Sequence, residues 1–128
     1  MKDFVMYHNP DAMGIEVESM PGLSIVTDKE PKGIEGSRIW LLTGRGSPRR
    51  YFLRSWFIVD RIEPEPTGRF KSKLSGTSGK VFDPMIELNQ EPWFADFVRS
   101  QGRFAFGFQA IKEERFVKGL KRVARLEE

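Results

Sequence analysis

Two apolar segments separated by a basic loop constrain the fold of this chain more than any other feature. Residues 39–43 are rich in branched aliphatic and aromatic side chains, and residues 51–62 form a longer segment of the same kind. The loop between them, residues 44–50, reads Gly-Arg-Gly-Ser-Pro-Arg-Arg, and its glycines and proline favour a turn. The pattern predicts two antiparallel strands joined by a loop that carries Arg45, Arg49 and Arg50.

Alternation along residues 51–62 assigns two faces to the second strand. The face that contains Leu53 and Phe57 is mostly apolar, so it is expected to pack in a core. The opposite face combines aromatic rings, including Trp56, with charged residues, so it is expected to border solvent or a ligand. Trp40 and Trp56 can therefore be either core residues or part of a binding surface.

Further strands and two helices are predicted around this hairpin. The strand candidates are residues 4–8, 14–18, 22–27, 69–74 and 104–108, and residues 67–83 otherwise form a basic, exposed excursion. One helix is expected over residues 92–101, capped by Asn89 and ended by Gly102, and another over residues 112–126. Four phenylalanines are expected in the core: Phe57, Phe97, Phe106 and Phe116.

Length and composition exclude several classes of protein. The chain has 128 residues, of which 39% are hydrophobic and 30% charged, as in a soluble globular domain. No apolar run approaches the length of a membrane span, and residues 1–3 do not begin a signal peptide. The absence of cysteine excludes disulfides and thiolate metal sites. We expect one domain over residues 1–128, located in the cytoplasm.

Positive charge is concentrated in the middle of the chain. The formal net charge of the whole chain is +3. Residues 38–80 contain ten basic and three acidic residues, whereas residues 1–37 contain three basic and seven acidic ones. The excess of positive charge therefore lies on the predicted hairpin and the segment after it, where a polyanion would bind. A solvated basic surface without a ligand explains the same pattern.

Residue types that carry catalysis are sparse. His8 is the only histidine, and no cysteine is present to share a metal ion with it. Residues 76–80, Gly-Thr-Ser-Gly-Lys, end like a phosphate-binding loop, but Leu74 stands at the first glycine position and Val81 at the magnesium-binding Ser/Thr position. Two clusters of acidic residues could form the metal site of a nuclease: Asp60, Glu63 and Glu65, and Asp83 with Glu87. Neither cluster has a lysine at the spacing of a nuclease motif. We expect no catalytic activity, no cofactor and no metal ion.

Three segments resemble the PUA-like superfamily, and within it the EVE domains and the related ASCH and YTH domains. Residues 5–11, Val-Met-Tyr-His-Asn-Pro-Asp, are similar to the opening strand and following loop of EVE domains. Residues 36–41, together with the strand at 56–62, resemble their central strand pair. Residues 103–114, with Gln-Ala-Ile before the last helix, resemble their closing strand and terminal helix.

The resemblance implies an α+β fold, a twisted β-barrel of about five to seven strands with flanking helices, one of them C-terminal. It also implies a cleft for nucleic acid. The chain is similar to N-terminal reader modules of modification-dependent HNH-type endonucleases, and reader domains of this kind flip a modified base into an aromatic pocket. Ser37 stands where EVE domains usually carry aspartate, and residues 67–88 have no counterpart in them.

Site residues follow from this resemblance and from the aromatic and basic positions. The base pocket is expected to contain His8, Asn9, Trp40 and Trp56, with Asn9 bonding a base edge and the indole rings stacking. Phosphates are expected to bind Arg45, Arg49, Arg50, Lys71 and Lys73. The expected partner is DNA, with a possible nuclease domain or subunit beside it.

Two alternatives remain open for the function. A PUA-like domain can equally bind RNA. A small-molecule or protein-interaction module on the same barrel would explain the aromatic residues, although it would not explain the basic segment.

Overall fold

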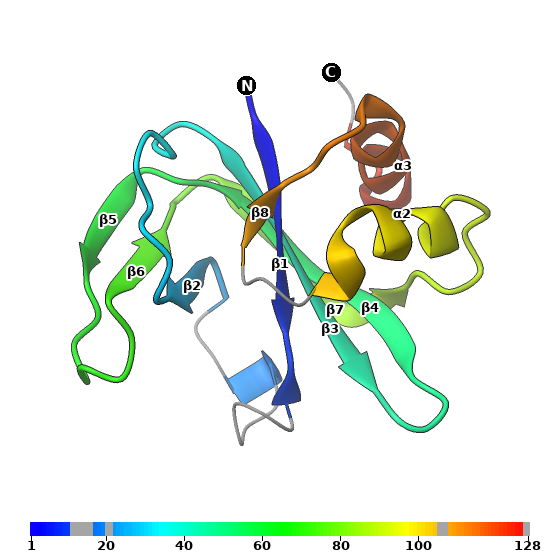
Figure 1. Cartoon of the computed structure of the whole chain (residues 1–128), viewed down its shortest axis with the longest axis horizontal. Helices are drawn as coiled ribbons and strands as arrows, with labels where there is room; N and C mark the ends of the chain where they lie inside the picture. The colour runs from blue at the N-terminus through cyan, green and yellow to red at the C-terminus, as the bar shows by residue number, and fades with distance from the viewer. Residues whose placement is uncertain (11–16, 20–21, 105–107, 127–128) are drawn as a thin grey trace.

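The structure, a computed structural model, describes residues 1–10, 17–19, 22–104 and 108–126 (Figure 1). Its strands are β1 (Asp3–His8), β2 (Ser24–Thr27), β3 (Arg38–Arg45), β4 (Arg50–Ile58), β5 (Arg61–Pro64), β6 (Ser72–Ser75), β7 (Gly79–Glu87) and β8 (Gln109–Ala110). Its helices are α2 (Phe94–Ser100) and α3 (Glu114–Ala124), with 3-10 turns η1 (Val17–Ser19) and η2 (Gly102–Phe104). The predicted α+β class with a C-terminal helix is confirmed.

The described strands form two open sheets. The larger sheet has the order β7-β4-β3-β1-β8, and the smaller has the order β2-β6-β5. β1 runs parallel to β3, and the other pairs are antiparallel. The predicted hairpin is confirmed as β3 and β4, with Trp40 opposite Trp56. The pairings of the described strands do not close the barrel that the resemblance implies.

The predicted strand over residues 51–62 is divided between the two sheets. β4 ends at Ile58, and after a bend the chain continues as β5 in the smaller sheet. Its partner bends at the same place, where β6 passes into β7, so the two segments make one long bent hairpin. Glycines allow the close backbone approach at this bend, because a Cβ on Gly76 would lie 1.9 Å from the Ile58 carbonyl oxygen.

A β-bulge at Arg54 changes the predicted faces of β4. Leu42 pairs with Leu53 and Leu41 with Ser55, so Arg54 is an extra residue in the pairing with β3. Leu53 and Trp56 consequently belong to one core, whereas Phe57 belongs to the core on the other face of the sheet. The prediction of two uniform faces along residues 51–62 is therefore wrong.

Two hydrophobic cores lie on opposite faces of the larger sheet. The first joins Leu42 and Leu53 to α2 and α3 through Phe97 and Phe116. The second joins Phe57 and other residues of the larger sheet to the smaller sheet through Ile25 and Leu74. Figure 1 shows the helices and the smaller sheet on either side of the strands β1, β3 and β4. The predicted burial of Phe57, Phe97 and Phe116 is confirmed, and Phe106 lies outside the described residues.

The structure confirms some of the other predicted strands and helices and contradicts others. Strands near residues 4–8 and 22–27 and helices within 92–101 and 112–126 are confirmed with shorter or shifted bounds. Strand β7 lies entirely outside the predicted strands, because its sequence contains Asp83-Pro84 and does not alternate. Phe104 of the predicted strand 104–108 lies in the 3-10 turn η2 instead of a strand. Val17 of the predicted strand 14–18 lies in the 3-10 turn η1, and residues 14–16 lie outside the described part.

Asn89 does not cap the first helix. Its side-chain oxygen accepts a hydrogen bond from the Tyr51 amide, and the residue before the helix is Trp93, which makes no side-chain cap. The end of this helix is stabilised differently, through the fully buried side chain of Gln101. The side chain of Gln101 donates to the Ala110 carbonyl at 3.0 Å and accepts from the Lys112 amide at 3.1 Å. It thereby joins α2 to the segment that enters α3.

Candidate nucleic-acid interface

The four residues predicted to form a base pocket lie in two separate places. Trp40 pairs with Val5 of β1, whereas His8 lies three residues further along β1, opposite Thr43. Val5 and Trp40 belong to the core beneath the helices, and alternation directs His8 to the opposite face of the sheet. His8 and Asn9 therefore do not approach the two tryptophans.

Trp40 is a core residue. Its side chain has no exposed surface, and its indole Nε1 donates to the Asp3 carboxylate at 2.9 Å. The guanidinium group of Arg38 lies over both indoles, 5.6 Å from the Trp40 ring and 5.3 Å from the Trp56 ring. Since a stacked base needs an accessible ring face, this buried Trp40 has no surface for the predicted contact. Trp56 is half-buried and lines a hollow on the surface.

The hairpin arginines lie at the other end of β1, beside His8. Arg45 and Arg50 face each other where β3 and β4 leave the sheet, and Arg49 stands in the loop between them. Arg49 donates to the Tyr7 hydroxyl at 2.6 Å. Gly44 leaves room for this pair, because a Cβ there would lie 2.2 Å from the Tyr7 oxygen.

Two of the arginines form ion pairs with carboxylates from remote segments. Arg45 pairs with Glu18 of η1, and its hydrogen bond holds the pKa of the Glu18 carboxyl below the ordinary value. Arg50 makes a bidentate pair with Glu87 of β7, at 3.0 and 2.5 Å. The same contacts lower the pKa of the Glu87 carboxyl and raise the pKa of Arg50. The sequence placed these cations on a basic surface, but internal carboxylates neutralise part of their charge.

The ring of Phe52 lies between the paired arginines. Its centroid is 6.0 Å from the guanidinium carbon of Arg45 and 5.6 Å from that of Arg50. The ring is half-buried, and alternation places it on the face of the sheet opposite Leu53 and the helices. An accessible aromatic ring with two guanidinium groups is the combination that binds a base and its phosphates. We call Arg45, Arg49, Arg50 and Phe52 the hairpin site.

Lys71 and Lys73 do not belong to the hairpin site. Lys73 lies on β6 of the smaller sheet, opposite Val26 and Glu63. Lys71 lies just before this strand, and its amide donates to Asp28. Figure 1 shows the β5–β6 hairpin on the other side of β1 from the β3–β4 hairpin, so the predicted phosphate contacts form two groups.

Two of the carboxylates considered as a nuclease centre, Asp60 and Glu65, accept hydrogen bonds from threonines. Asp60 accepts hydrogen bonds from the amide and the hydroxyl of Thr77, both at 3.0 Å. Glu65 accepts from Thr67 at the tip of the β5–β6 hairpin, and these bonds lower the pKa of its carboxyl. Within the described ranges, no group of three histidine, aspartate or glutamate side chains could hold a metal ion. Residues 76–78 of the Gly-Thr-Ser-Gly-Lys segment form the bend between β6 and β7, and Gly79 and Lys80 begin β7.

Sequence analysis missed Tyr7, Glu18, Phe52 and Glu87 as members of this interface. Phe52 carried a signal, because it alternates with Arg54 on the strand face expected to border solvent or a ligand. The other three carried none, since Tyr7, Glu18 and Glu87 lie 42, 27 and 37 residues from their arginine partners in the sequence. Only the folded chain brings such residues together.

Comparison with known proteins finds no relative: no protein-family model, no curated protein and no solved structure matches this chain. In the part of the chain that the structure describes, neither helix is long and apolar enough to cross a membrane. The function therefore has to be inferred from the chain's own residues.

Proposed function

We propose that this chain is a nucleic-acid-binding module that contacts its ligand through the hairpin site and reads a modified, flipped base in DNA. The observation that carries the proposal is the half-buried Phe52 ring between the guanidinium groups of Arg45 and Arg50. Guanidinium groups bind phosphate oxygens through paired hydrogen bonds, and an aromatic ring stacks on any base. The resemblance to PUA-like reader domains supports the modified base, the flipping step and the barrel-like architecture.

The internal carboxylates define how such a ligand would bind. A phosphate approaching Arg50 competes with Glu87, and one approaching Arg45 competes with Glu18, because each guanidinium is already paired. The exchange of carboxylate for phosphate costs little, since exposed ion pairs contribute little to stability. Removing the carboxylate should therefore increase affinity by strengthening the local positive potential.

Phe52 takes the stacking role that the sequence assigned to the tryptophans. Trp40 is buried, and Trp56 lies on the opposite face of the sheet from the Phe52 ring. His8 and Asn9 are at the same end of β1 as the hairpin site. His8 is buried, with 4% of its surface exposed, whereas Asn9 is half-buried, so Asn9 is the candidate for contacts to the base edge. Lys71 and Lys73 would contact phosphates further along the same nucleic acid.

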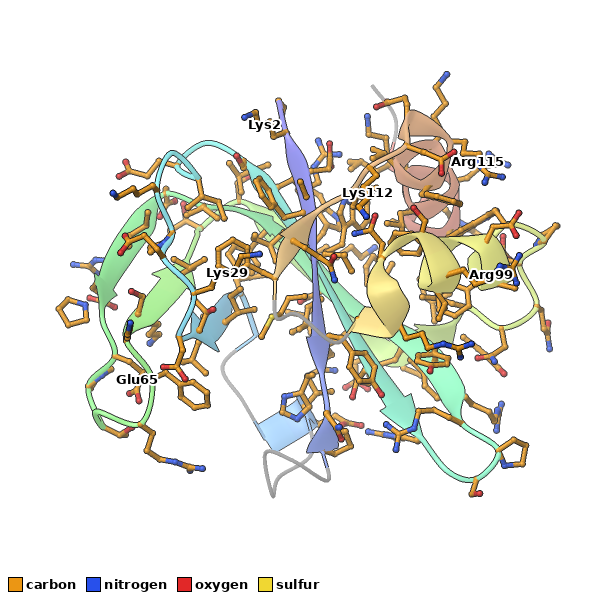
Figure 2. The ribbon with its side chains drawn as sticks, in the orientation of Figure 1. Lys2, Lys29, Glu65, Arg99, Lys112 and Arg115 are labelled. Carbon is orange, nitrogen blue, oxygen red and sulfur yellow. The ribbon has the colours of Figure 1, made fainter. Side chains whose placement is uncertain are left out.

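Salt-dependent binding of oligonucleotides tests the phosphate contacts. Arg49→Ala/Arg50→Ala should weaken binding and reduce the slope of log K against log salt by about one to two, because fewer counterions are released. Glu87→Gln should strengthen binding. The matched control is Arg99→Ala/Arg115→Ala, where Figure 2 shows both side chains beside the helices, away from the loop that joins β3 and β4. An unchanged slope in the hairpin variant would exclude the hairpin site.

A panel of methylated and unmethylated DNA and RNA oligonucleotides tests the base. Phe52→Leu keeps an apolar side chain but removes the ring, so it should lower affinity by about 1–3 kcal/mol and erase preference for the modified oligonucleotide. Weak, salt-sensitive binding through the arginines should remain. A Phe52→Leu protein that keeps its preference would place the base elsewhere, and equal affinity for methylated and unmethylated DNA in the unaltered chain would refute base reading.

A further inference from the structure

A second surface lies on the other face of the larger sheet. A hollow of about 520 Å³ is open to solvent between the edge strand β7 and the last turn of α3. Trp56, Phe82 and Ile86 line it from the sheet, and Val123 and Leu126 line it from the helix and the segment after it. Its floor is thus apolar, and it extends from the first core.

The charged side chains that line this hollow are positive. Lys80 stands on β7, directly opposite Trp56, with its ammonium group 5.5 Å from the Phe82 ring. Arg125 follows α3 with φ of 56°, and both cations are exposed. No ion pair joins either cation to a carboxylate within the described ranges. The described residues that line the hollow include no acidic side chain. Their one neutral side-chain group that can form a hydrogen bond is the Trp56 indole N–H. The side chains therefore complement an apolar group that carries negative charge.

The shape and lining favour a polypeptide over a small molecule or a base. A small ligand usually has most of its surface buried, whereas this hollow is open on one side. A stacked base needs a free ring face. Here the Phe82 ring is 7% exposed, and the Arg38 guanidinium lies over the Trp56 ring. A bulky side chain inserted from a partner, with carboxylates on either side of it, satisfies both the apolar floor and the cationic rim.

We propose that this hollow is a docking site for an acidic peptide segment that presents a leucine or phenylalanine between aspartates and glutamates. The apolar side chain would contact Trp56, Ile86 and Val123. The flanking carboxylates would pair with Lys80 and Arg125. Trp56 and Phe52 are four residues apart on β4 and lie on opposite faces of the sheet, so this site is independent of the hairpin site.

Fluorescence anisotropy with a labelled peptide, Asp-Glu-Asp-Leu-Phe-Asp-Glu-Asp, tests the proposal at low salt. Two control peptides replace Leu-Phe by Ser-Ser or the acidic residues by lysine, and both should bind at least about tenfold more weakly. Amide chemical-shift changes should concentrate at Lys80, Ile86 and residues 123–126. If the Ser-Ser peptide binds as tightly as the Leu-Phe peptide, binding is non-specific charge attraction and the proposal is wrong.

Charge reversal at the rim provides the second test. Lys80→Glu/Arg125→Glu should weaken binding of the peptide about tenfold or more. The control Lys112→Glu/Lys118→Glu makes the same change in net charge at other exposed positions and should not weaken binding. Arg49→Ala/Arg50→Ala should leave peptide binding unchanged, which separates this site from the proposed nucleic-acid site. If thymidine octanucleotide shifts the same amides and loses affinity in Lys80→Glu/Arg125→Glu, the occupant is nucleic acid and the peptide proposal is wrong.

Discussion

The indole N–H of Trp40 donates a hydrogen bond of 2.9 Å to the carboxylate of Asp3, beneath the helical layer of the protein. The bond joins β3 to the first residue of β1, its parallel neighbour in the sheet. Asp3 also lies 3.6 Å from the Arg38 guanidinium, whose side chain is 5% exposed. The bond satisfies the only polar atom of an otherwise apolar ring, which is the condition for burying a tryptophan completely.

Replacing Trp40 should therefore affect folding more than binding. Trp40→Ala should destabilise the protein by about 3–5 kcal/mol, because it leaves a large cavity in the first core. Trp40→Phe should cost less and should retain any nucleic-acid binding, because it keeps an aromatic ring in the core. Urea unfolding monitored by circular dichroism measures both variants. A Trp40→Ala protein of unchanged stability would contradict the buried position.

Gly119 allows Trp93 to pack against α3. A Cβ at this position would lie 2.5 Å from Cε2 of the indole and 2.8 Å from its Nε1, so the ring would have to move. Alanine usually favours a helix over glycine by about 1 kcal/mol, but overpacking costs about 1–3 kcal/mol. We expect Gly119→Ala to destabilise the protein, with Lys118→Ala, an exposed neighbour on the same helix, as the control. Thermal melts of the two variants give the comparison, and a stabilised Gly119→Ala would show that the ring adapts at no cost.

The buried side chain of Gln101 should be essential for the approach to α3. Gln101→Leu keeps most of the side-chain volume but removes the side-chain partners of the Lys112 amide and the Ala110 carbonyl. Each of these two groups that stays buried without a partner should lower the stability by about 1–3 kcal/mol. Gln109→Leu removes only the 2.9 Å bond to the Gln101 carbonyl and should cost less. Hydrogen exchange at Lys112 should accelerate in Gln101→Leu more than in Gln109→Leu. The reverse order would assign the main role to Gln109.

Acid should weaken the fold through Glu18, the carboxylate paired with Arg45 of the hairpin site. The pKa of Glu18 is lowered by the hydrogen bond from Arg45, so its stabilising effect is complete above the ordinary value of 4.5 and is lost as the pH falls through the lowered pKa. The effect is at most about 1 kcal/mol, because the pair is partly exposed. Melting temperatures of Glu18→Gln and the unaltered chain should differ at pH 7 and converge in acid. Glu30→Gln, at an exposed carboxylate, is the control and should follow the unaltered chain throughout.

The sequence alone determined the elements whose pattern is local. The hairpin of β3 and β4 followed from two apolar segments around a loop with glycine and proline, and α2 and α3 followed from apolar stripes at helical spacing. The buried phenylalanines Phe97 and Phe116 followed from the same stripes, because periodicity reports which face of an element meets a core. The position of the three hairpin arginines was predicted from the turn-forming glycines and proline of the same loop.

Only the tertiary structure decided which aromatic rings are accessible and which charges are neutralised. One bulge residue, Arg54, moved Trp56 to the face of Leu53, and packing of the helices on that face buried Trp40 while Phe52 stayed near the surface. Contacts with Glu18 and Glu87 paired Arg45 and Arg50 across long sequence separations. The physical reason is that a strand in a sheet covered on both faces carries apolar residues on each face, so its periodicity does not identify the buried side. Burial and ion pairing then depend on segments that only folding brings near.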